Sequence, residues 1–326
     1  MKKLYIHIGT HKTATTWLQH FLGKNSRRLE DHGFYYPKAG RVNQAQHRLG
    51  QAIFRRPKPV TSLNDVPVWQ KFKHEISLTN CENIVLSSEE FEWVGRPNII
   101  REYLSGVEIH VVVYLRRQDD YLESLYGQQI RDFGPRLTKT IDRYIADSEL
   151  RFLDYKRLVD RWKSASDQLT VRIFDRGALK DGDIGTDFLS VLGIYSRDGF
   201  EIPTAAMIDH KASMGLEALE FIRQCNFLKL DPASHRELVG QVIKLDKIAS
   251  ASLGKDSRRL LSFDQRKSIV GKYIQGNRHI AQHYFQGGSL PDLFPAVKEQ
   301  GPVYPQSDDF NRFEVALKVS QLVKTA

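Results

Sequence analysis

The stretch KKLYIHIGTHKTATTWLQHFL, residues 2–22, decides the fold of this chain. Its first part, residues 3–8, is rich in β-branched and aromatic side chains, which favour a strand, and it ends at Gly9. After a short polar loop, residues 15–22 carry the apolar spacing of a helix. A strand, a loop and a helix in this order predict the first unit of an α/β fold.

The same alternation continues over the first 200 residues. Apolar and β-branched runs predict further strands at residues 83–87, 107–115 and 169–174. Helical patterns lie between or after them, around residues 121–130, 152–162 and 187–192. Strands that alternate with helices form a parallel sheet flanked by helices, and the loops after its strands share the rim where ligands bind.

Beyond residue 200 the patterns are helical only, at residues 214–225, 235–248, 263–284 and 312–323. We therefore expect residues 1–200 to form the α/β core and residues 201–326 to form a helical cover that belongs to the same domain. The segments 38–67 and 286–309 are rich in Pro, Gly and Gln and are predicted to be loops.

The 326-residue chain has 48 Lys and Arg against 39 Asp and Glu, which gives a formal charge of +9. Its basic residues are scattered in short pairs, which suits a small polyanionic ligand or an acidic polymer as substrate, and we expect no nucleic-acid partner. Cys81 and Cys225 lack the spacing of a zinc or redox site, so we expect a cytoplasmic protein without a metal. Since no run approaches about 18 apolar residues, we expect no membrane insertion.

The loop from Gly9 to Thr16 has the composition of an anion site. Backbone N–H groups and the positive end of a helix converge there, and Lys12 and up to three threonine hydroxyls add donors. A simple turn with one threonine cap is the alternative. The nucleoside-triphosphate pattern GxxxxGK[ST] does not fit, because its second Gly falls on Ala14 and its Lys falls on Thr15.

A second anion signature follows the predicted strand at residues 107–115. Arg116 ends this strand, and Ser124 lies on the next predicted helix, 124 − 116 = 8 residues later. A guanidinium at a strand end and a hydroxyl on the following helix can converge on one phosphate. The alternative is that Arg116 pairs with Asp119 or Asp120 and that the serine is incidental.

Together the two signatures resemble those of the sulfotransferases that use 3′-phosphoadenosine 5′-phosphosulfate, in particular the bacterial carbohydrate type. The 5′-phosphosulfate loop of that family reads K-[TS]-G-T-T-x-L, and residues 12–18 here read KTATTWL. Residues 174–194 are a further, softer similarity. Ala14 replaces the usual Gly, so either its φ is negative or the loop is slightly opened.

The resemblance implies a P-loop-like α/β fold and transfer of a sulfuryl group to a hydroxyl or amine of an acceptor, for which we expect a carbohydrate. No metal is implied. Lys12 would stabilise the bridging oxygen of the leaving phosphate. The donor nucleotide would be held by Lys12, Thr13, Ala14, Thr15, Thr16, Trp17, Arg116 and Ser124, with Trp17 either packing or lying near the adenine.

The acceptor needs a base, and the sequence offers four candidates. Glu89 is the first choice, because it follows the strand at residues 83–87 on the same rim, where the resembled family often has Glu or His. Glu90 is the alternative if the register differs. The others are His11, beside Lys12, and His47, in the polar segment QAQHRL.

Two other functions remain open on the sequence. A nucleotide-dependent kinase of P-loop fold would need magnesium and an acidic ligand after a strand, which Asp119, Asp120 or Glu89 could supply. A non-catalytic polyanion-binding protein would follow from the charge of +9 and would bind with a steep salt dependence.

Overall fold

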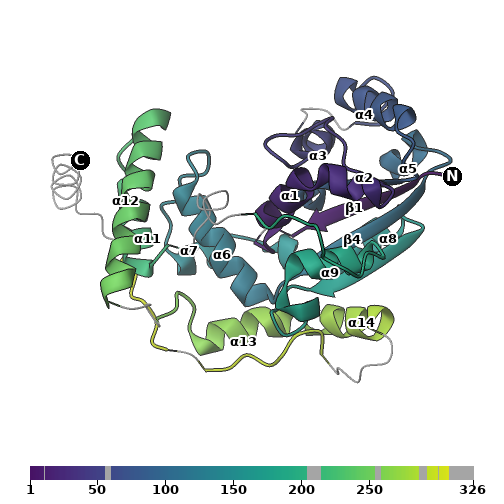
Figure 1. Cartoon of the computed structure of the whole chain (residues 1–326). Helices are drawn as coiled ribbons and strands as arrows, with labels where there is room; N and C mark the ends of the chain where they lie inside the picture. Colours follow the sequence, from purple (N-terminus) through teal and green to yellow (C-terminus); the bar gives the residue numbers. More distant parts are fainter. Residues whose placement is uncertain are drawn as a thin grey trace. The chain divides into compact units, whose positions relative to one another are not determined.

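The computed structural model of the chain describes residues 1–10, 12–55, 60–203, 214–253, 258–285, 292–299 and 301–307. The chain contains a five-stranded parallel sheet with the order β2-β3-β1-β4-β5. Figure 1 labels two of its strands, β1 and β4, with helices beside them. The predicted α/β class with a parallel sheet and flanking helices is confirmed. The strands are β1 (Lys3–Gly9), β2 (Phe34–Tyr35), β3 (Asn83–Ser87), β4 (Glu108–Leu115) and β5 (Gln168–Ile173).

Helices follow each strand. Those up to β4 are α1 (Thr15–Lys24), α2 (Ser26–Asp31), α3 (His47–Phe54), α4 (Pro67–Leu78), the 3-10 helix η1 (Glu89–Trp93) and α5 (Asn98–Tyr103). Around β5 lie α6 (Gln118–Arg131), α7 (Ile141–Ala146), η2 (Arg151–Leu153), α8 (Tyr155–Lys163), η3 (Lys180–Gly182) and α9 (Ile184–Val191). The later helices are α11 (Leu216–Cys225), α12 (Pro232–Leu253), α13 (Phe263–Lys272) and α14 (Ile274–Tyr284).

The four predicted strands lie within two residues of their observed bounds, but one predicted loop is wrong. The segment 38–67 contains α3, whose Leu49 and Ile53 are buried. The indole of Trp69 donates a hydrogen bond to the carbonyl of Leu49 at 3.1 Å. Contacts with distant residues thus stabilise a helix whose own sequence, with Gly50 in it, is a weak helix former.

Other differences concern the second half of the chain. The predicted helix at residues 263–284 is divided into α13 and α14 at Tyr273. The predicted helix at residues 312–323 lies outside the described residues. The short strand β2 and the helices α4, α5 and α7 were not expected from the sequence patterns.

The core lies on both faces of the sheet. Tyr5, Val85 and Val112 point to one face and pack with apolar residues of α1, α2 and α9. The alternate residues Ile6 and Val111 are also buried, on the face where α8 contacts β4 and β5. A sheet covered on both faces explains why the central strands are continuous apolar runs.

Contacts divide the chain into two units. The first contains the sheet and comprises Met1–Arg116, Asp154–Lys211 and Gln275–Phe294. The second comprises Arg117–Leu153, Ala212–Ile274 and Pro295–Ala326. The partition into a core of residues 1–200 and a cover of residues 201–326 remains a prediction.

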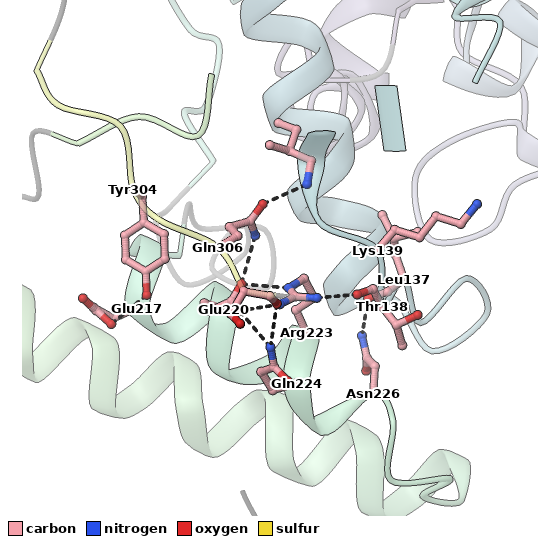
Figure 2. A network of polar contacts seen from close by, with 12 residues as sticks. Leu137, Thr138, Lys139, Glu217, Glu220, Arg223, Gln224, Asn226, Tyr304 and Gln306 are labelled. Carbon is pink, nitrogen blue, oxygen red and sulfur yellow. Dashed lines mark hydrogen bonds and ion pairs between the residues drawn. The ribbon is translucent and has the colours of Figure 1, made fainter. Parts of the chain in front are cut away.

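A network of hydrogen bonds surrounds the buried Arg223 in the second unit (Figure 2). Arg223 is 1 % exposed, and it donates hydrogen bonds to the carbonyls of Thr138 and Ser307 and to the carboxylate of Glu220. The side-chain amide of Gln306 donates to the same carboxylate at 2.9 Å. These bonds satisfy a charge that is costly to bury and attach residues 301–307 to α11.

Candidate functional site

Three neighbouring strands, β3, β1 and β4, end at the same edge of the sheet. Two hydrogen bonds join their ends: the N–H of Ser88 donates to the carbonyl of His7 at 3.2 Å, and the hydroxyl of Thr10 donates to the carbonyl of Tyr114 at 2.8 Å. The segments that follow these strands therefore share one rim, as the sequence predicted. All three strands belong to the first unit.

The loop between β1 and α1 is held by its own threonines. Thr10 and Thr13 are fully buried, and the hydroxyl of Thr13 donates to the carbonyl of Thr10 at 2.7 Å. A Cβ atom placed on Gly9 would lie 1.8 Å from the methyl group of Thr15, so only glycine permits this approach. In this structure Thr13 stabilises the loop, and its contact with a phosphosulfate remains a prediction.

Two residues of the loop have left-handed backbone conformations. Lys12 has φ 71° and Ala14 has φ 54°. Of the two alternatives for Ala14, the negative φ is therefore wrong, and the slightly opened loop remains a prediction. The positive φ places a methyl group at a position where glycine would be unstrained. Ala14 is the N-cap of α1 and makes no side-chain capping bond in the described chain, so the first-turn N–H groups can bind water or an anion.

Arg116 connects the end of β4 to this loop. Its Nη1 atom lies 3.3 Å from the carbonyl oxygen of Lys12, although the two residues are 104 positions apart. The carbonyl of Arg116 accepts a hydrogen bond from the hydroxyl of Tyr155 at 2.6 Å. Two residues that the sequence singled out separately thus meet at one place on the rim.

The second partner expected for the 3′-phosphate lies in the other unit. Ser124 is half-buried on α6, and its convergence with Arg116 remains a prediction. Two carboxylates were alternative partners of Arg116. Asp119 accepts hydrogen bonds from Arg117 at 2.7 Å and from Arg266 at 2.6 Å, and Asp120 accepts one from Arg266 at 2.9 Å. These residues form an ion-pair cluster within the second unit, in which Asp119 and Arg266 are buried.

Thr16 and Trp17 follow in the first turn of α1 and are half-buried. The Trp17 ring stacks on Phe21, with 5.3 Å between the centroids, and the guanidinium of Arg197 lies 5.5 Å from the Trp17 ring. A Cβ atom on Gly185 would come within 2.8 Å of Trp17. Trp17 therefore packs tightly against its neighbours, and a contact with an adenine remains a prediction.

The carboxylate of Glu89 lies at the start of η1, directly after β3. The residue as a whole is 6 % exposed, and Oε2 of Glu89 accepts a hydrogen bond from the amide of Gln19 at 2.7 Å. Nδ1 of His47 is 3.9 Å from the same oxygen and 2.8 Å from the hydroxyl oxygen of Ser88. The structure thus brings together two of the four candidate bases.

The other two candidates are placed differently. Glu90 accepts hydrogen bonds from the amide of Gln51 at 2.7 Å and from the guanidinium of Arg55 at 3.3 Å. Its carboxylate is therefore engaged with α3. His11 lies outside the described residues.

The position of His47 depends on close packing between α3 and η1. A Cβ atom on Gly50 would lie 3.0 Å from the backbone carbon of Glu90, so the small residue allows the contact. Gln46 holds the start of α3 to β3, since its side-chain carbonyl accepts from the N–H of Ser87 at 2.9 Å. Neither contact was expected, because the sequence assigned this segment to a loop.

His7 is a residue of the site that sequence reasoning missed. It is fully buried in β1, and its Nδ1 atom lies 2.8 Å from the hydroxyl oxygen of Ser87. Burial lowers the pKa of His7 to about 3, although the charge of Glu89 acts in the opposite direction. His7 is therefore neutral near pH 7. A histidine inside an otherwise apolar strand is the signal that could have identified it.

Among the described side chains, no group of three or more His, Cys, Asp or Glu residues could hold a metal ion. Within the same ranges, no helix has both the length and the apolar character needed to cross a membrane.

No family model matches the chain. An uncharacterized protein of Archaeoglobus fulgidus is 26 % identical over 236 residues, which are 70 % of this chain and 60 % of that protein, so the chain spans less than two thirds of its relative. The crystal structure of a sulfotransferase from Alicyclobacillus acidocaldarius aligns with a TM-score of 0.43 and 16 % identity, covering 75 % of this chain and 96 % of that one.

Proposed function

We propose that the protein is a sulfotransferase that moves a sulfuryl group from 3′-phosphoadenosine 5′-phosphosulfate to an acceptor. One observation carries the proposal: Arg116 Nη1 lies 3.3 Å from the carbonyl of Lys12. The two segments that resemble the phosphate signatures of sulfotransferases therefore adjoin at the rim where α/β proteins bind ligands. A chance resemblance would not require the two segments to meet.

The loop after β1 would hold the 5′-phosphosulfate. The N–H groups at the start of α1 and the ammonium of Lys12 supply positive charge where the bridging oxygen gains negative charge during transfer. Arg116 would bind the 3′-phosphate through its guanidinium, with Ser124 as a second donor. Most of the catalysis would come from positioning and from stabilisation of charge, as in phosphoryl transfer.

The acceptor would approach from the side of β3. The group of Glu89, His47 and Ser88 lies beyond the end of that strand and can remove a proton from a hydroxyl or amine. A carbohydrate is the acceptor class that the sequence resemblance favours. The donor is a co-substrate, and the proposed reaction uses no metal.

Calorimetric titration tests the donor site without knowledge of the acceptor. Adenosine 3′,5′-bisphosphate should bind in the presence of EDTA, and adenosine 5′-phosphate should bind at least about tenfold more weakly, because it lacks one phosphate contact. A preference for ATP with magnesium would instead indicate a kinase. Binding of heparin alone, with a steep salt dependence, would indicate a polyanion-binding protein.

A further inference from the structure

We infer that His47 is the base that takes the proton of the acceptor and that Glu89 is its positioning residue. The inference rests on the proposed function and reverses the order of the candidates in the sequence, where Glu89 came first. It is carried by the contacts of the two side chains, by their different exposure and by the way α3 is held against η1.

The Nδ1 edge of the imidazole faces the protein. Nδ1 of His47 lies 2.8 Å from Oγ of Ser88 and 3.9 Å from Oε2 of Glu89. Oγ of Ser88 also accepts the N–H of Glu90 at 3.1 Å, and a hydroxyl oxygen can accept a second hydrogen bond. An Nδ1–H proton therefore has both an acceptor and a nearby carboxylate, which favours the tautomer protonated at Nδ1.

This tautomer leaves a lone pair on Nε2, the nitrogen that can act as a base. Within the described ranges, Nε2 of His47 has no hydrogen-bond partner. The side chain of His47 is 20 % exposed, whereas that of Glu89 is 9 % exposed. Oε2 of Glu89 is in addition occupied by the amide of Gln19 at 2.7 Å. An acceptor can thus reach His47 more readily than it can reach the carboxylate.

The charged groups around His47 support the same assignment. Of the acidic residues on η1, Glu89 faces the imidazole, while Glu90 is engaged by Gln51 and Arg55. On β1, burial lowers the pKa of His7 to about 3, so this residue adds no positive charge near pH 7. Glu89 is thus the carboxylate placed to stabilise the imidazolium that forms when His47 accepts a proton.

The oxygen of an acceptor hydroxyl attacks the sulfur of the donor, and its proton passes to Nε2 of His47. The bond between sulfur and the bridging oxygen breaks, and the electron pair leaves with adenosine 3′,5′-bisphosphate, near Lys12. His47 then returns its proton to solvent. An acceptor amine would lose a proton in the same way.

Nitrogen NMR of the free protein tests, without any substrate, whether Glu89 holds His47 in the tautomer protonated at Nδ1. The ¹⁵N shifts of His47 at pH 8 should show the proton on Nδ1 in the wild type, and the Glu89→Gln variant should move the population toward the Nε2–H form. Wild-type protein with the proton on Nε2 would overturn the inference, because that nitrogen could not act as a base. An exposed histidine on α4, His74, gives the reference shifts.

Turnover separates the roles of the two residues. With radiolabelled donor and methyl glycosides of glucose, galactose and N-acetylglucosamine as acceptor probes, His47→Ala should lower incorporation by about 100-fold or more. Added imidazole should restore part of the rate, and binding of adenosine 3′,5′-bisphosphate should not change. Glu89→Gln should retain measurable turnover, with the acid limb of kcat/KM moved to lower pH. His74→Ala is the matched control.

The outcomes distinguish this inference from the proposed function. If Glu89→Gln abolishes incorporation while His47→Ala keeps it, Glu89 is the base and the inference is overturned. If the wild type does not bind the bisphosphate, the proposed function fails, and this result is independent of the tautomer of His47. If none of the probes is modified, the NMR comparison still shows which nitrogen of His47 carries the proton and whether Glu89 determines this.

Discussion

Nη1 of Arg116 lies 3.3 Å from the carbonyl oxygen of Lys12, which joins the end of β4 to the loop after β1. The contact places a guanidinium beside a loop that has two left-handed residues and a helix N-terminus. Two sources of positive potential are therefore held together before any ligand binds, which reduces the ordering cost of binding an anion.

Replacement of Arg116 by Ala should mainly weaken recognition of the 3′-phosphate. Loss of hydrogen bonds from a charged donor costs about 1.5–3 kcal/mol, so the affinity for adenosine 3′,5′-bisphosphate should fall by about 10- to 100-fold. The affinity for adenosine 5′-phosphate should change much less. Calorimetry of both nucleotides measures the difference. Arg96→Ala, which removes an exposed arginine, is the control, and equal losses for both nucleotides would contradict the assignment.

Replacement of Lys12 by Ala should affect the chemical step. The ammonium is expected to stabilise the leaving oxygen in the transition state, so turnover should fall by about 100- to 1000-fold while the affinity for the bisphosphate changes little. Incorporation of radiolabelled sulfate into methyl glycosides measures the first quantity, and calorimetry measures the second. Lys71→Ala, on an exposed position of α4, is the control. Unchanged turnover would remove Lys12 from the mechanism.

Gly9 is required by the close approach of Thr15. Gly9→Ala would place a methyl group 1.8 Å from Cγ2 of Thr15, so we expect a loss of about 1–3 kcal/mol in the free energy of unfolding and weaker binding of the bisphosphate. Thr15→Ser removes that methyl group and should restore part of both losses in the double variant. A double-mutant cycle in urea measures the coupling between the two sites. If the effects of Gly9→Ala and Thr15→Ser on the free energy of unfolding are additive, the two positions are not coupled and the prediction is wrong.

The left-handed conformation of Ala14 predicts that glycine is better at this position. Ala14→Gly should remove a backbone strain of about 1–2 kcal/mol from the folded state. Glycine also makes the unfolded chain more flexible, which lowers the free energy of unfolding by about 0.5–1 kcal/mol. The net effect should be an increase in the free energy of unfolding of up to about 1 kcal/mol. The helical control Ala52→Gly, in α3, should be destabilised by about 0.5–1 kcal/mol. Thermal unfolding of both variants measures the contrast. The same loss in both would argue against a positive φ at Ala14.

Burial of His7 makes stability depend on pH. Its pKa is lowered to about 3 in the folded protein, while the unfolded chain binds the proton near pH 6.5. Between pH 6.5 and about pH 3 the unfolded state therefore binds more protons than the folded state. The free energy of unfolding falls as the pH drops through this range, by up to about 1.4 kcal/mol per pH unit. His7→Gln should flatten the dependence between pH 6.5 and 4.5 in urea unfolding. His74→Gln should leave it unchanged, and parallel curves for His7→Gln and the wild type would contradict the prediction.

Much of the fold could be predicted because its signals are local. The strand at residues 83–87 was predicted with its observed bounds, since a short apolar run between polar residues is typical of a central parallel strand. The helix α3 could not be predicted, because it depends on the packing of Leu49 and Ile53 and on the bond from Trp69. Such contacts join segments far apart in the chain and leave little pattern in a local window.

For the site, the same distinction holds. The sequence by itself determined which residue types follow β1, β3 and β4, and a parallel sheet brings these strand ends to one edge. Only the tertiary structure decided the φ of Ala14, the contact of Arg116 with Lys12 and the meeting of Glu89 with His47. Sequence spacing specifies order along the chain, whereas the distances between side chains depend on how whole elements pack.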